Sequence, residues 1–158
     1  MVAEQSEGED LALSLTHELF DLGTAIDLIG NAAATRLGIN QTDLICLNLL
    51  VRYGPMSPGQ IAATLGVTTA AISAMASRLE SGGYAHREID PADRRRVLLH
   101  ASPTGASQAF NLFDHFYAAT AALQESSTES ELRALLTLLT RFREVIQEQA
   151  AAIRSDDT

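Results

Sequence analysis

The sequence lacks lysine and tryptophan altogether and has one cysteine, Cys46, among its 158 residues. A single cysteine excludes an intrachain disulfide bond and a metal site built from several thiolates. Apolar runs fall well short of the roughly 20 residues that a membrane-spanning helix needs. The N-terminal segment, MVAEQSEGED, is acidic where a secretory signal peptide would be basic. We therefore expect a cytoplasmic protein, and we expect Cys46, within the run LICLNLL, to be an inert buried thiol.

Charge is distributed unevenly along the chain. The net charge is −9, but residues 54–105 hold five arginines and four acidic residues, which gives this segment +1 and leaves −10 for the remainder. A protein binds DNA through a local basic surface, and an acidic remainder lowers nonspecific affinity without covering that surface. The overall charge therefore does not exclude nucleic-acid binding. The length and a hydrophobic content of 46% are sufficient for one globular domain with its own core.

The stretch SPGQIAATLGVTTAAISAMAS, which starts at Ser57, predicts two short helices joined by a tight turn. Ser57 can cap the first helix, with Pro58 at the first helical position and Gln60 completing a capping box. Gly66 can end this helix in the left-handed conformation, and Thr68 can cap the second helix two residues later. These signals leave no room for a longer loop.

Both predicted helices have apolar residues at helical spacing, and small residues where their backbones would approach, at Ala62 and Ala63. This combination is typical of a helix-turn-helix, in which two helices cross steeply. An ordinary helical hairpin is the alternative interpretation of the same stretch. The shared core is expected to comprise Ile61, Leu65, Val67, Ile72, Met75 and Leu79.

The outward face of the second helix is small and either polar or methyl-bearing, so the helix can lie deep in a major groove. Threonine and alanine methyls can contact thymine methyls, and hydroxyls can bond base edges or phosphates. Thr68 can also act only as a helix cap. The residues on this face are Thr68, Thr69, Ala70, Ser73 and Ser77.

A β-hairpin is predicted after these helices, because strand-like residues 85–89 and 97–101 flank a turn with the sequence DPADRRR. Three successive arginines at its tip suit a DNA backbone or a narrow minor groove, and Asp93 can orient Arg95 by a charge-assisted hydrogen bond. The alternative is a solvated charge run, but the short distance to the second helix favours a DNA-binding wing. The full set of predicted DNA contacts is Ser57, Thr68, Thr69, Ala70, Ser73, Ser77, Arg78, Asp93, Arg94, Arg95 and Arg96.

Long helices are predicted on both sides of this region, each with an apolar stripe at alternating spacings of three and four. Both apolar stripes must be buried, and a domain of this size has little other surface against which they could pack. We therefore expect a homodimer. The alternative is that they pack only on their own chain. The predicted dimer contacts are Leu15, Leu19, Leu22, Leu135, Leu139, Phe142 and Ile146.

Residues 37–105 resemble the MarR family of winged helix-turn-helix transcriptional regulators, through LGVTTAAISAMASRLESGGYAHR and the later DPADRRRVLLHASPTG. The resemblance implies a mainly α, winged-helix (α+β) fold in which the helix near Thr68 reads the major groove and Arg95, two residues after Asp93, enters the minor groove. It also implies a dimer on a pseudo-palindromic operator and, as the family default, repression. Ala74 and Gly82 replace residues that are usually basic, so we expect fewer phosphate contacts.

By the same resemblance, a small phenolic or lipophilic ligand would bind where the dimer helices meet the winged region. The residues that would line this pocket are His17, Phe20, Tyr53, Phe110 and Phe113. Each of these is also a plain core candidate. No cofactor is expected, and the four histidines, scattered through the sequence as His17, His86, His100 and His115, indicate no metal site.

The predicted organisation is one continuous domain with a flexible acidic tail at residues 1–8, dimerisation helices at 9–36 and 104–154, and a winged helix-turn-helix at 37–103. No nucleophile with a base, and no carboxylate pair in a motif, suggests an enzyme. A protein-interaction module that uses the winged fold without binding an operator remains the alternative function. Three successive arginines at the predicted wing favour DNA.

Overall fold

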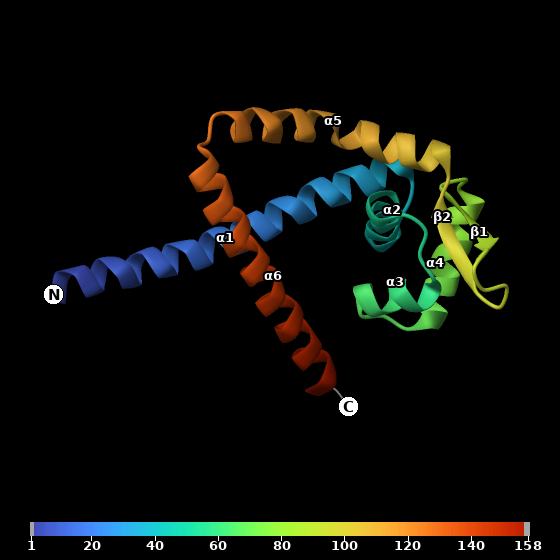
Figure 1. The fold of residues 1–158 in the computed structure, drawn as a ribbon, viewed down its shortest axis with the longest axis horizontal. Coiled ribbons are helices and arrows are strands. Elements are labelled where there is room, and N and C mark those ends of the chain that lie inside the picture. Colours follow the sequence, from blue (N-terminus) through green and yellow to red (C-terminus); the bar gives the residue numbers. More distant parts are fainter. Residues whose placement is uncertain (1, 157–158) are drawn as a thin grey trace.

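The computed structural model describes residues 2–156, which form six helices and a two-stranded antiparallel sheet. The mainly α winged-helix fold predicted from the sequence is confirmed. Figure 1 shows the strands and the short helices gathered at one end, with α1 extending away from them toward the N-terminus. In chain order the elements are α1 (Val2–Leu37), α2 (Gln41–Tyr53), α3 (Pro58–Leu65), α4 (Thr69–Ser81), β1 (Ala85–Ile89), β2 (Val97–Ala101), α5 (Pro103–Glu125) and α6 (Glu129–Asp156).

Side-chain caps start the short helices where the sequence predicts them. The Ser57 hydroxyl accepts a hydrogen bond from the Gln60 amide, and the Gln60 side chain accepts one from the Ser57 amide, which completes the capping box of α3. Gly66 ends α3 at φ 65°, in the left-handed region that favours glycine. Thr68 caps α4 by accepting from the Ala71 amide. The helix axes of α3 and α4 therefore meet at a bend of 110°.

The two strands pair as the hairpin of a wing. Ala85 lies opposite Ala101 and Ile89 opposite Val97, and the strand bounds are those expected from the sequence. Met56, in the segment before α3, forms a bridge to Leu99 of β2 through two backbone hydrogen bonds. This bridge fixes the hairpin to the start of the helix-turn-helix.

The main core lies between α2, α3, α4 and the hairpin. Ile61, Ile72, Met75 and Leu79 are buried there, as predicted, and Leu65 packs partly buried against them. The prediction is wrong for Val67, which is 36% exposed because it lies in the turn between the crossing helices. A smaller cluster, Ala33, Ala34 and Leu44, joins α1 to α2 and is covered by Leu37, Leu112 and Phe113.

The long helices leave much of their apolar surface exposed. Of the predicted dimer contacts, Leu15 and Leu22 on α1 and Leu135 and Ile146 on α6 are exposed. Leu19 and Phe142 are half-buried, and Leu139 is 40% exposed.

Helix α1 already begins at Val2, which differs from the flexible tail expected at residues 1–8. Its first residues include alanine, glutamate and glutamine, which favour helix, and no proline interrupts them. Met1 lies outside the described residues.

No single helix within residues 2–156 is both long enough and apolar enough to cross a membrane, and the pair α3 and α4 reaches that length only across its bend.

Candidate nucleic-acid interface

Helix α4 has one buried face and one exposed face. Ile72, Met75, Ala76 and Leu79 are buried against the core. The opposite face consists of small side chains, and all five residues predicted to lie outward are exposed there: Thr68, Thr69, Ala70, Ser73 and Ser77. Because none is larger than threonine, the helix backbone can approach the floor of a major groove closely.

The two serine hydroxyls on this face already have backbone partners. Ser73 donates to the carbonyl of Thr69 at 3.1 Å, and Ser77 donates to the carbonyl of Ser73 at 3.0 Å. A hydroxyl oxygen keeps acceptor capacity after it donates, and its hydrogen can rotate to another acceptor. These serines can therefore still contact a base edge or a phosphate.

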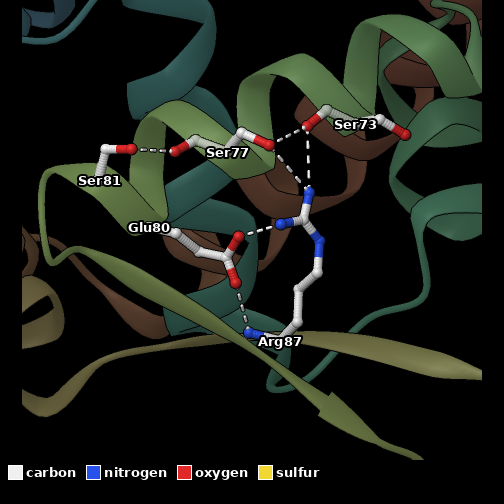
Figure 2. A network of polar contacts seen from close by, with 5 residues as sticks. All are labelled: Ser73, Ser77, Glu80, Ser81 and Arg87. Atoms are coloured by element: carbon white, nitrogen blue, oxygen red, sulfur yellow. Dashed lines mark hydrogen bonds and ion pairs between the residues drawn. The ribbon is translucent and has the colours of Figure 1, made fainter.

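Arg87 of β1 ties the wing to α4 through several polar contacts, which Figure 2 shows. Its guanidinium forms an ion pair with Glu80 and donates to the Ser73 carbonyl at 3.1 Å and to the Ser77 hydroxyl at 3.3 Å. The Arg87 amide also donates to the other carboxylate oxygen of Glu80, at 2.9 Å. One arginine thus links the hairpin to successive turns of the exposed helix. It holds the two candidate DNA-reading elements in a fixed relation.

Sequence reasoning missed this role of Arg87. Ser73, Ser77 and Ser81 recur every four residues on one stripe of α4, and Arg87 follows after the turn. The serine spacing predicts a contact with Arg87 only if the face of the hairpin that lies against α4 is known. Successive residues of a strand lie on opposite faces, so the sequence alone does not show on which face Arg87 lies.

Arg78 has a different environment from the other predicted DNA contacts. Its Nε and a terminal nitrogen donate to the two carboxylate oxygens of Asp43 on α2, at 2.8 and 2.6 Å. Asp43 is 2% exposed and Arg78 50% exposed. The hydrogen bonds from this carboxylate raise the pKa of the Arg78 guanidinium, which keeps it charged. The structure thus places Arg78 in a bidentate pair that fastens α4 to α2.

The tip of the wing is ordered by its two aspartates. The Asp90 carboxylate accepts from the Ala92 amide at 2.8 Å and lies 4.0 Å from Nε of Arg96. The Asp93 carboxylate accepts from the backbone amide of Arg95 at 3.0 Å. Asp93 therefore shapes the backbone beneath Arg95 and does not hold its guanidinium, as the sequence had suggested. All three arginines of the tip are exposed.

Four of the five residues predicted to line a ligand pocket are exposed in the single chain. Phe20 and Phe110 are 73% and 56% exposed, His17 and Tyr53 are also exposed, and Phe113 packs on the small cluster at α1 and α2. Within residues 2–156, two surface hollows adjoin the end of α1, and none of the five residues lines either of them. One hollow includes Asp43 and Arg78, and the other lies between α1 and α5.

Cys46 is completely buried in the main core, as expected for an inert thiol. Burial, and secondarily the nearby Asp43 carboxylate, raises the pKa of Cys46 to about 11. At neutral pH the side chain is therefore a protonated thiol, which is a poor nucleophile.

Comparisons with known proteins agree on one family. Residues 37–96 match the sequence profile of the MarR family. The chain is 32% identical over 150 residues to an uncharacterized HTH-type transcriptional regulator, YcgE of Bacillus subtilis (strain 168), a match that covers 95% of this chain and 96% of the relative.

Solved structures share the fold at lower identity. A MarR family protein from Bacillus stearothermophilus superposes with a TM-score of 0.68 at 16% identity, covering 88% of this chain and 97% of the other. Wild-type MarR from E. coli, in its apo form, gives a TM-score of 0.59 at 22% identity, covering 81% and 96%.

Proposed function

The chain belongs to the MarR family of transcriptional regulators, and we propose that it represses transcription by binding a pseudo-palindromic operator as a homodimer. The observation that carries this proposal is the exposed, small-residue face of α4 beside an exposed arginine tip, with Arg87 fixing one relative to the other. A groove-reading helix and a wing need this rigid spacing to engage one duplex together.

In the proposed complex, the outward face of α4 enters the major groove, where Thr69, Ala70 and Ser73 meet base edges. The wing follows the backbone to the adjacent minor groove, into which Arg95 projects. Arg94 adds a phosphate contact. Arg78 and Arg96 act mainly through their carboxylate partners, by holding α4 and the wing tip in place.

The homodimer is supported by the apolar surface that α1 and α6 leave exposed. Leu22 is 45% exposed and Ile146 59% exposed, and each is a predicted dimer contact. Burying one such side chain fully contributes roughly 1.5–3 kcal/mol, so covering both stripes favours association strongly. A second copy of the same chain offers matching stripes and a two-fold axis, which a pseudo-palindromic site requires.

We also propose that a small phenolic or lipophilic effector releases the repressor. Phe20, Tyr53 and Phe110 are exposed aromatic residues of the single chain, with His17 and Phe113, and they offer apolar contacts for such a ligand. The effector would act by favouring a separation of the two DNA-reading units that does not fit the operator. Such coupling between sites is typically about 1–3 kcal/mol.

The proposal is tested by selecting bound duplexes from a random DNA pool with the full-length protein and sequencing them. We expect inverted half-sites whose centres lie about one helical turn apart. Sedimentation of the free protein should give the mass of two chains. A pool without an enriched motif, from a protein that sediments as a dimer, would favour the alternative of a protein-interaction module. Repression is then checked by transcription in vitro from a promoter that contains the selected site.

A further inference from the structure

The hairpin brings together two histidines that lie far apart in the sequence. His86 of β1 pairs directly with His100 of β2, and Glu88 lies two residues along β1 from His86. Residues two apart on a strand share one face, so all three side chains lie on the same side of the hairpin. Arg87 projects from the other side, toward α4. The interpretation of these histidines as scattered is therefore wrong for this pair.

The three side chains converge through their donor atoms. The two imidazole rings stack with centroids 5.2 Å apart and an interplanar angle of 24°. Nε2 of His100 lies 3.7 Å from a carboxylate oxygen of Glu88, which is too long for a hydrogen bond. One donor atom from each of the three residues lies within 4.8 Å of the other two.

One of these donors is buried and has no hydrogen-bond partner within the described residues. Nε2 of His100 is shielded from solvent and makes no hydrogen bond to any residue that the structure describes. An unsatisfied buried polar atom is costly, and each one in a folded protein needs an explanation, such as an ion. The other two members of the trio, His86 and Glu88, are exposed, so water can reach the donors from their side.

We propose that His86, Glu88 and His100 form a binding site for a divalent transition metal of the zinc class on the outer face of the wing. Two imidazoles and one carboxylate are ligands that Zn²⁺ accepts, with water in a fourth position. Donor atoms around a tetrahedral Zn²⁺ with bonds of about 2.0–2.1 Å lie about 3.4 Å apart. Rotation of the exposed side chains of His86 and Glu88 would shorten the distances between the donor atoms from the present limit of 4.8 Å to that spacing.

The bound metal would link β1 to β2 across the hairpin. It would also replace the negative charge of Glu88 with a net positive charge on the face of the wing. This site does not depend on the proposed DNA binding, because its ligands all lie on the hairpin and none of them is a predicted DNA contact.

The test is a zinc titration of the full-length protein, free of any histidine tag and stripped of metal, in competition with a chromophoric chelator. We expect one Zn²⁺ per chain. His86→Gln and Glu88→Gln replace exposed residues and should fold normally, and each should weaken zinc binding by at least about tenfold, since loss even of a supporting partner costs about 10–100-fold. Zinc should also raise the thermal midpoint of the wild type, and at the same zinc concentration it should raise that of His86→Gln less.

Two exposed histidines elsewhere provide matched controls. His17→Gln on α1 and His115→Gln on α5 remove the same type of ligand and should bind zinc as the wild type does. The proposal is overturned if the wild type fails to compete with the chelator, or if His86→Gln and Glu88→Gln bind zinc as tightly as these controls. The trio would then be an ordinary cross-strand contact.

Discussion

The pair of Asp43 and Arg78 predicts an asymmetric response to the loss of either partner. Arg78→Ala removes two charge-assisted hydrogen bonds and leaves a carboxylate that is 2% exposed. Asp43→Ala instead frees an arginine that is 50% exposed and can turn into water. The buried partner, not the number of hydrogen bonds lost, should decide the size of each effect.

The magnitudes follow from this difference in burial. Breaking a buried ion pair by removing one partner costs about 3–5 kcal/mol. Asp43 borders an open hollow that water can enter, so we expect about 2–3 kcal/mol for Arg78→Ala. Asp43→Ala should cost about 1–1.5 kcal/mol, since an ordinary net hydrogen bond contributes about 0.5–1.5 kcal/mol and water solvates the freed arginine. The double variant should be no less stable than Arg78→Ala alone.

The assay is urea unfolding at neutral pH, with all variants at one protein concentration because stability of a dimer depends on it. A cycle of the wild type, both single variants and the double variant isolates the coupling between the two side chains. If Asp43→Ala proves as destabilising as Arg78→Ala, the asymmetry in burial does not control the pair. If the two losses simply add, the contact contributes nothing.

Further predictions concern four single positions. Cys46 should resist a thiol reagent until the protein unfolds, and fast labelling of the native protein would contradict this. Because the pKa of Cys46 is raised from 9.0 to about 11, the unfolded chain loses this proton first, so the stability measured in urea should fall as the pH rises between these values. Gly105→Ala should destabilise by about 1–3 kcal/mol, because its methyl would lie 2.8 Å from Cα of Tyr84. Gly59→Ala should stabilise the protein by about 0.5 kcal/mol, because the added methyl group would have no neighbour within 4 Å. If the thermal midpoints of both glycine variants moved in the same direction, the packing argument would be refuted. Arg87→Ala should weaken DNA binding in fluorescence anisotropy without changing its salt dependence, and a reduced salt slope would show that Arg87 contacts phosphate instead.

Local signals in the sequence were sufficient for the helix-turn-helix. The hydrogen bonds of Ser57 with Gln60, and of Thr68 with the Ala71 amide, span three residues, so residue type and spacing determine them. The left-handed Gly66 between them follows from the same few residues. These features depend little on the rest of the fold.

Long-range side-chain pairs could not be predicted in this way. Asp43 and Arg78 are 35 residues apart, and their contact depends on how α4 packs across α2. Asp43 lies in the first turn of α2, where an acidic residue is favourable without any distant partner. No periodicity in either helix identifies the partner of the other.

The pair of His86 and His100 could have been predicted in part from the sequence. The strand bounds expected from the sequence agree with β1 and β2, and an antiparallel hairpin that joins Ala85 to Ala101 must place His86 opposite His100. Working out the register would have revealed the pair, whereas a search for helical ligand spacing could not. The predicted pocket residues Phe20, Tyr53 and Phe110 are exposed in the single chain, and the proposed dimer would bring further surface toward α1 and α6.

The central claim is that the chain binds operator DNA through the tip of its wing. It is tested most directly by fluorescence anisotropy on the DNA upstream of its own gene, against scrambled DNA, across a salt series. Arg95→Ala should bind more weakly and reduce the salt slope by about one. Arg133→Ala, which removes the same charge from an exposed position on α6, should behave as the wild type. Equal binding to both DNAs, with the same slope in all three proteins, would contradict the account.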